Sequence, residues 1–224
     1  MSRARVRALI AAGTLQATKI ADAYVVEEKA VDALAARSRP AHVRSFSRRI
    51  AWACAALVDG QHPTGLRADE LSRLRARLDR SEGDAGAWQN RLVARTAHSG
   101  RYRAGPAAVQ RLLADGRAAR TGVSATNLVG DAILSAPGAD VWVSSDLDQR
   151  RLRADHGLLP STSGNVTIRV AEIDGLRVLG CADGNAFRLM VAADLLDAPD
   201  TRTRYAGAEL LRAAISERRW RSAA

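Results

Sequence analysis

Two acidic residues, Asp146 and Asp148, have the spacing of a carboxylate pair that could hold metal ions for catalysis, and two serines precede them. The same segment, from Ser145 to Asp148, also fits the first turn of a helix, where acidic side chains interact favourably with the helix dipole. We expect this segment to begin a helix, and a catalytic carboxylate pair is the alternative.

Other catalytic arrangements are not expected. The histidines lie in linker-like or helix-end segments without a second ligand at i+3 or i+4, which argues against a metal site; they are His42, His62, His98 and His156. The glycine-rich segment from Gly180 to Gly184 lacks the Lys-Ser/Thr pair of a phosphate-binding loop and is predicted to be a plain loop. The sequence therefore predicts neither a cofactor nor an enzymatic activity.

Arginine dominates the charge of the chain. The 224 residues include 34 Lys+Arg and 24 Asp+Glu, and only two of the basic residues, Lys19 and Lys29, are lysines. Residues 1–120 contain 22 basic and 11 acidic residues, a net charge of +11, whereas residues 121–224 contain 12 and 13, a net charge of −1. A polyanionic partner is therefore expected to bind the first half. Arginines that merely solvate helix faces are the alternative.

The first 36 residues are predicted to form a helix, a short hairpin and a second helix. The first helix is expected over 2–12, between the N-cap Ser2 and the stop at Gly13, and its polar side carries Arg3, Arg5 and Arg7. Two short strands follow, within 15–20 and 24–26, joined by a tight turn. A second helix is expected over 27–36.

This order resembles the excisionase-like winged helix-turn-helix family, and the matching text is Ser2 to Leu15, Lys19-Ile20 and Tyr24-Val25-Val26. In that family the first of these helices enters the DNA major groove and the hairpin is a wing near the phosphates. The resemblance implies a DNA-binding site whose guanidinium groups donate to guanine or phosphate. Its residues would be Ser2, Arg3, Arg5, Arg7 and, on the wing, Lys19. A solvated helix face is the alternative for the three arginines.

The family's scaffold helix, which precedes the recognition helix, has no counterpart before Ser2. We therefore hypothesise that Met1 is an alternative start inside a longer gene. The first domain is expected to span residues 1–38.

Residues 39–120 are predicted to be a helical linker and middle region. A basic stretch, 37–44, reads as the linker, and helices are expected from 46 to about 58, over 67–80, around 88–93 and from Pro106, with a short strand at 101–103. Cys54 lies on the apolar stripe of the first of these helices and is expected to be buried and reduced. The arginines of 67–80 either solvate a helix face or extend a phosphate-binding surface.

Residues 121–224 are predicted to form a small α+β domain, which makes the whole chain α+β. Strands are expected at 140–144, 165–170 and 176–179, and helices at 123–129, 145–156, 187–197 and 201–217. Asp200 is predicted to cap the last helix. The arginine-tryptophan cluster at 217–221 either binds an acidic partner or nucleic acid, or frays.

The order of short segments across about 121–215 resembles the C-terminal part of AbiEi-type antitoxins. The segments are Gly122-Val123-Ser124-Ala125, Asp140-Val141-Trp142-Val143, Leu158-Leu159-Pro160, Asn165 to Val170, and Ala192 to Arg202. In that family the N-terminal module represses its own operon, and the protein counters a toxin of the nucleotidyltransferase type.

Together these features predict a non-enzymatic DNA-binding antitoxin and autorepressor whose partners are double-stranded operator DNA and a nucleotidyltransferase-type toxin. The alternative is a protein-interaction module that binds a toxin or regulator without binding DNA. No apolar run approaches the roughly 20 residues of a membrane span, and the segment after Arg7 is too short for a signal peptide, so we expect a cytoplasmic protein. The sequence leaves the oligomeric state open.

Overall fold

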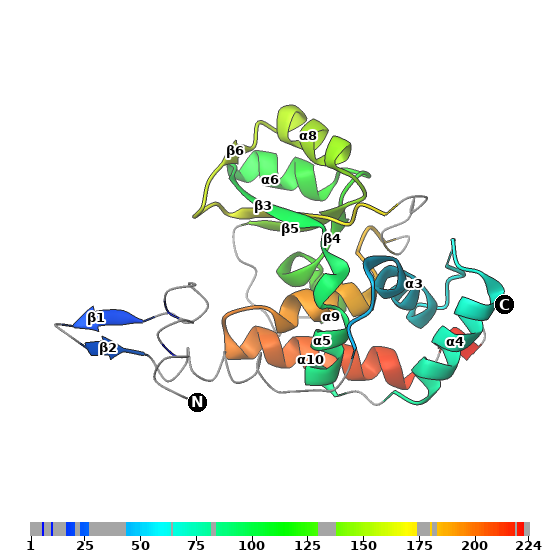
Figure 1. Ribbon diagram of the computed structural model, residues 1–224. Helices are drawn as coiled ribbons and strands as arrows, with labels where there is room; N and C mark the ends of the chain where they lie inside the picture. Colours follow the sequence, from blue (N-terminus) through cyan, green and yellow to red (C-terminus); the bar gives the residue numbers. More distant parts are fainter. Residues whose placement is uncertain are drawn as a thin grey trace. The chain divides into compact units, whose positions relative to one another are not determined.

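The structure is a computed structural model (Figure 1) that divides into two compact units, residues 1–43 and 44–224. The described residues are 6, 10, 17–20, 23–26, 44–63, 65–81, 84–129, 138–173, 180, 183–217 and 219–221. Among them, no helix is both long enough and apolar enough to cross a membrane.

The first unit contains a two-stranded hairpin. Strand β1 (Thr18–Ile20) pairs antiparallel with β2 (Ala23–Val25), so that Lys19 lies opposite Tyr24. Two residues connect the strands, as in the tightest hairpins. The predicted hairpin is therefore confirmed. Val6 and Ile10 are helical, as expected, while the rest of the first helix and all of 27–36 lie outside the described residues.

The second unit is built on a five-stranded sheet of order β4-β5-β7-β3-β6. Its strands are β3 (His98–Arg103), β4 (Ala119–Arg120), β5 (Ala139–Val143), β6 (Leu159–Pro160) and β7 (Val166–Val170). Strands β5 and β7 are parallel, and the other neighbouring pairs are antiparallel. The connection between the parallel strands contains a helix, as such crossovers usually do.

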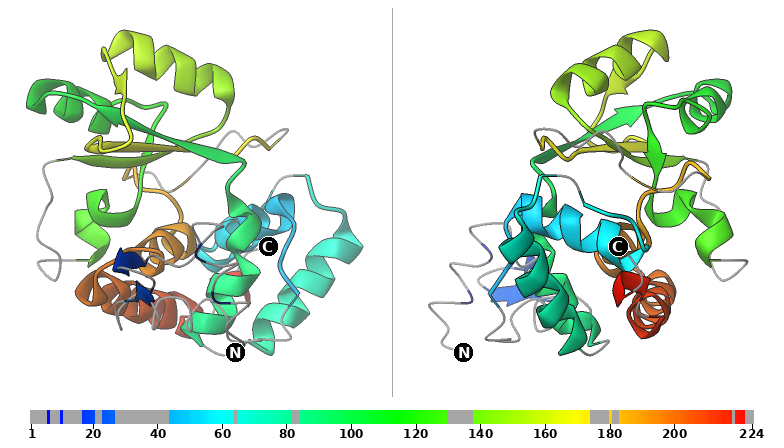
Figure 2. Two further views of the ribbon diagram at one scale, coloured as in Figure 1. Left: turned by 60° about the vertical axis from the view of Figure 1, so that its left-hand side comes forward. Right: turned by 90° about the vertical axis from the view of Figure 1, so that its right-hand side faces the viewer.

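Helices cover both faces of this sheet (Figures 1 and 2). Helices α6 and α8 lie on one face, α9 lies under the other face, and α10 lies on the far side of α9. The α-helices of this unit are α3 (Arg48–Val58), α4 (Ala68–Asp79), α5 (Ala85–Arg91), α6 (Pro106–Leu113), α7 (Thr126–Val129), α8 (Asp146–Asp155), α9 (Arg188–Leu196) and α10 (Thr201–Ser216). Short 3-10 turns include η1 (Val93–Arg95), η2 (Gly122–Ser124) and η4 (Arg219–Arg221).

Helix α9 is the centre of the larger of two apolar cores. Every residue from Leu189 to Leu196 is buried, which is typical of a helix enclosed by other elements. Its closest neighbour is α10, where a Cβ at Gly207 would lie 2.8 Å from the Cβ of Leu195 and 2.9 Å from the carbonyl oxygen of Ala192. The two helices therefore approach closely because residue 207 has no side chain.

Several local predictions are confirmed. Asp200 caps α10 by accepting from the backbone amide of Thr203, and Cys54 is fully buried in α3. Trp220 is also buried, and its indole Nε1 donates to Asp79 at 3.1 Å. The prediction that the cluster at 217–221 either frays or binds a partner is thus wrong for Trp220, which packs into the apolar core.

The α+β class is confirmed, but the boundaries differ from the predicted 1–38, 39–120 and 121–224 segments. The sheet draws β3 from the predicted middle region and pairs it with β7 over five residue pairs. Residues 44–224 consequently form one unit, and the first unit ends at Val43. The strand predicted at 176–179 lies outside the described residues.

Candidate functional site

The residues that the sequence assigns to DNA binding belong to the first unit. Ser2, Arg3, Arg5 and Arg7 lie outside the described residues, and Lys19 lies within them. Lys19 is the central residue of β1, directly opposite Tyr24. Opposite residues in an antiparallel pair lie on one face, and Tyr24 is 46% exposed. The hairpin therefore carries an exposed tyrosine directly opposite Lys19.

The acidic pair of the sequence, Asp146 and Asp148, starts helix α8. The hydroxyl of Ser145 accepts from the backbone amide of Asp148, as an N-cap does. The carboxylate of Asp148 accepts from the hydroxyls of Ser144 and Ser145 at 2.5 and 2.8 Å. The helix-start interpretation is confirmed, because these oxygens are engaged at the cap.

The imidazoles of two histidines pair with carboxylates. Nε2 of His98 lies 2.8 Å from Oδ1 of Asp146, and Nε2 of His156 lies 3.0 Å from Oδ2 of Asp115. Among the described residues, no group of three or more His, Cys, Asp and Glu could hold a metal ion. Burial raises the pKa of the Cys54 thiol to about 12, so the reactive thiolate is scarce at neutral pH.

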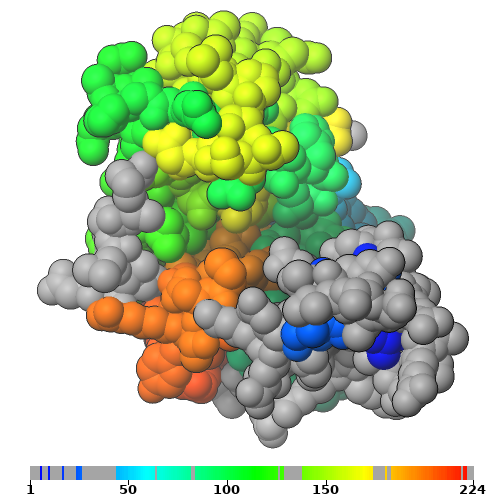
Figure 3. All heavy atoms as spheres, turned by 90° about the vertical axis from the view of Figure 1, so that its left-hand side faces the viewer, coloured from blue at the N-terminus to red at the C-terminus, as the bar shows by residue number. Residues whose placement is uncertain are grey.

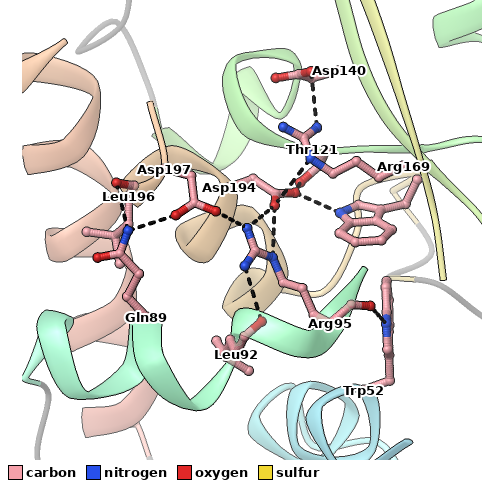
Figure 4. A network of polar contacts seen from close by, with 11 residues as sticks. Trp52, Gln89, Leu92, Arg95, Thr121, Asp140, Arg169, Asp194, Leu196 and Asp197 are labelled. Carbon is pink, nitrogen blue, oxygen red and sulfur yellow. Dashed lines mark hydrogen bonds and ion pairs between the residues drawn. The ribbon is translucent and has the colours of Figure 1, made fainter. Parts of the chain in front are cut away.

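A buried polar network surrounds Asp194, on α9 (Figure 4). One carboxylate oxygen, Oδ2, accepts from the hydroxyl of Thr121 at 2.6 Å and from the indole of Trp142 at 2.7 Å. The other, Oδ1, accepts from Nη2 and Nε of Arg95 at 2.8 and 3.1 Å. Nε of Arg169, from β7, is 3.6 Å from the same oxygen. Four separate segments thus converge on a single carboxylate.

Opposite charges keep this network ionised in the core. Burial would raise the pKa of Asp194, but the positive charges of Arg169 and Arg95 hold the pKa below its ordinary value. Burial would lower the pKa of Arg95, but the carboxylates of Asp194 and Asp197 raise the pKa instead. Each charge therefore depends on its neighbours, because an unpaired ion in the core would carry a large desolvation cost.

The network reaches solvent at both ends. Arg169 also donates to Asp140 at 3.1 Å, and that carboxylate is partly exposed. At the other end Arg95 donates to the half-exposed Asp197 at 2.5 Å, and Gln89 donates to the same carboxylate at 2.7 Å. Charges alternate along Asp140, Arg169, Asp194, Arg95 and Asp197. Because Asp194 is fully engaged with protein donors, the network connects the sheet to α9 and η1, and through Gln89 to α5, rather than binding a ligand.

Comparisons with family models, with curated proteins and with solved structures found no match to this chain.

The role of Asp194 was not predicted from the sequence, although a signal was present. Asp194 is the single charged residue between Leu189 and Leu196, in an otherwise apolar stretch. A carboxylate at the centre of an apolar helix is expected to be paired if that helix is buried. Its partners could not be predicted, since Arg95 and Arg169 lie 99 and 25 positions earlier in the chain.

Proposed function

We propose that the protein is a cytoplasmic, DNA-binding antitoxin that represses its own operon and counters a toxin of the nucleotidyltransferase type. The first unit would bind operator DNA, and the second unit would supply the antitoxin action. The two family resemblances of the sequence motivate this assignment, and the hairpin of the first unit supports it.

The supporting observation is the hairpin β1–β2, which follows a segment with helical residues inside a separate compact unit. A helix followed by a short antiparallel hairpin is the order that a winged helix requires. Residues 1–43 contain seven basic and four acidic residues, a net charge of +3, which suits a polyanion.

The proposed mechanism combines electrostatic docking with readout of the major groove. Arg3, Arg5 and Arg7 would donate to guanine edges or phosphates, and Lys19 would contact a phosphate from the wing. Each phosphate that a basic side chain neutralises contributes about −0.9 to the slope of log affinity against log salt. Operator binding should therefore weaken steeply and linearly on that plot.

The test is a gel-shift titration of the full chain on the DNA directly upstream of its own gene, at two salt concentrations. The triple variant Arg3→Ala/Arg5→Ala/Arg7→Ala should lose the specific shift. A matched control is Arg111→Ala/Arg150→Ala/Arg151→Ala, which removes the same charge from exposed side chains of α6 and α8 and should retain the shift.

Equal loss of binding by both triple variants would contradict the assignment of the three N-terminal arginines. No specific shift by the unmodified chain would contradict the DNA-binding function altogether. If the chain then co-purified with the product of the neighbouring gene, the interaction module without DNA binding would replace our proposal.

A further inference from the structure

Among the described residues of the second unit, no helix covers one half of the sheet face that α9 packs against. Tyr102 packs with Val109 and Leu112 of α6, so the odd-numbered neighbours of Tyr102 on β3 point to the opposite face, which is the face of α9. Those neighbours are Ser99, Arg101 and Arg103, and all three are exposed. On this face, Asp194 of α9 lies 3.6 Å from Arg169 of β7, which is opposite Ser99, and Ser124 of η2 accepts from the backbone amide of Asp140 on β5.

We call this surface the open face and define it by Ser99, Arg101, Arg103 and Thr167. The register places Thr167 opposite Arg101, and Leu159 of β6 lies opposite Arg103 at the outer border. Figure 3 shows the molecule from the side where the yellow and green segments of the sheet layer lie above the orange α9 and α10. An uncovered sheet face normally has polar side chains, and the open face does.

The two arginines of the open face have no carboxylate partner among the described residues, in contrast to Arg95, Arg117, Arg169 and Arg188. Successive same-face residues on a strand are separated by about 6.8 Å, twice the rise per residue of an antiparallel strand. Arg101 and Arg103 therefore present two adjacent guanidinium groups, with a hydroxyl from Ser99 and another from Thr167 nearby on the same face.

We propose that the open face binds the phosphate backbone of double-stranded DNA, as a second contact surface outside the winged-helix unit. This inference rests on the proposed function, which supplies the DNA. Arginine, serine and threonine are the side chains that donate to phosphate oxygens. Such contacts carry no base sequence information, so the open face adds affinity and salt dependence without changing operator preference.

The composition of the open face favours DNA over a protein partner. The centre of a protein interface usually contains aromatic or aliphatic anchors, whereas the only apolar side chain described at this surface is Leu159, at its border. Addition of a partner strand at the neighbouring edge is disfavoured because β6 has two residues and one is Pro160, which has no amide hydrogen to donate.

The test uses the full chain and a fluorescently labelled duplex from upstream of its gene, with affinity measured by anisotropy over a series of salt concentrations. The variant is Arg101→Ala/Arg103→Ala, and the charge-matched control is Arg150→Ala/Arg151→Ala on α8, which lies on the opposite side of the sheet. The variant should bind more weakly, with a salt slope less negative by about 1.8, and should keep its preference for operator over scrambled duplex. Arg101→Lys/Arg103→Lys should restore most of the slope.

Three results would overturn the inference. An unchanged slope in the Arg101/Arg103 variant would exclude the open face while leaving the proposed function intact. An equal change in the α8 control would show a general effect of net charge. Failure of the unmodified chain to bind any duplex would exclude both the inference and the DNA-binding function.

Discussion

Arg169 and Arg101 lie on neighbouring strands of the same sheet face, yet their surroundings differ completely. Arg169 is largely buried, donates a hydrogen bond to Asp140 and forms an ion pair with Asp194 of α9, whereas Arg101 is exposed and has no described carboxylate partner. On the covered half, charge is neutralised within the protein and contributes to holding the fold together. On the open half, Arg101 and Arg103 are exposed and form no ion pair among the described residues. The difference indicates that coverage by α9, rather than residue type, separates the arginines that stabilise the fold from those that stay exposed.

The largest expected change in stability follows from removing the charge of Asp194, the central carboxylate of the buried network. Asp194→Asn should lower the free energy of unfolding by about 3–5 kcal/mol, because Arg95 and Arg169 would keep their buried charge without the partner. Urea unfolding followed by circular dichroism measures the change.

Asp197→Asn is the matched control, since it removes a half-exposed carboxylate from the same arginine, Arg95. We expect a cost of about 1 kcal/mol or less for this control. An equal loss of unfolding free energy in the two variants would contradict the difference between the buried and the exposed carboxylate of the network.

The second effect concerns the packing that keeps Asp194 covered. Gly207→Ala should destabilise the protein by about 1–3 kcal/mol, because the added Cβ meets the backbone of α9 at 2.9 Å. Gly86→Ala, in the first turn of α5, is the control, and its Cβ would lie 3.6 Å from the nearest side-chain atom. That replacement should stabilise the helix by up to about 1 kcal/mol. Thermal unfolding should therefore show shifts of opposite sign, and shifts of the same sign would contradict the close helix contact.

The third effect is a dependence of stability on pH. The pKa of Asp194 is lower in the folded chain than the ordinary value of about 3.9, so the stability that it contributes is fully present above about pH 5. This contribution is lost as the pH falls through the folded-state pKa. Unfolding midpoints between pH 7 and pH 3 should decline more steeply in the unmodified protein than in Asp194→Asn. Parallel curves would show that Asp194 is not charged in the fold.

The smallest expected effect on stability concerns the exposed arginines of the open face. Arg101→Ala/Arg103→Ala should change the free energy of unfolding by no more than about 0.5 kcal/mol, because both side chains are exposed and neither is described in an ion pair. Urea unfolding of this variant, in parallel with Asp194→Asn, measures the change in the free energy of unfolding. A cost above 2 kcal/mol would mean that the open face stabilises the fold.

The sequence predicts most elements but not the way that they combine. Hydrophobic periodicity and capping residues were sufficient to predict the hairpin, the helix that contains Cys54, the helix that Asp200 caps, and the strands β5 and β7. The boundary expected at residue 120 was wrong because the pairing of β3 with β7 joins residues about 70 positions apart. Local patterns contain no information about such a pairing.

The same limit applies to the sites. The position of Asp194 in an apolar helix predicts that its carboxylate is paired. Its partners cannot be predicted from the sequence, because the tertiary fold brings them to it; they are Arg95, Thr121, Trp142 and Arg169. The open face cannot be predicted from the sequence either. The pattern Arg101-Tyr102-Arg103 predicts a strand, but it does not show which half of the sheet α9 covers.

The most direct test of the proposed DNA binding is an equilibrium titration of the intact chain with the duplex from upstream of its gene and with a scrambled duplex of equal composition, each over a range of salt. We expect tighter binding to the upstream duplex, with an affinity that falls linearly against salt on logarithmic axes. Equal affinity for both duplexes, or an affinity that salt leaves unchanged, would contradict the proposal.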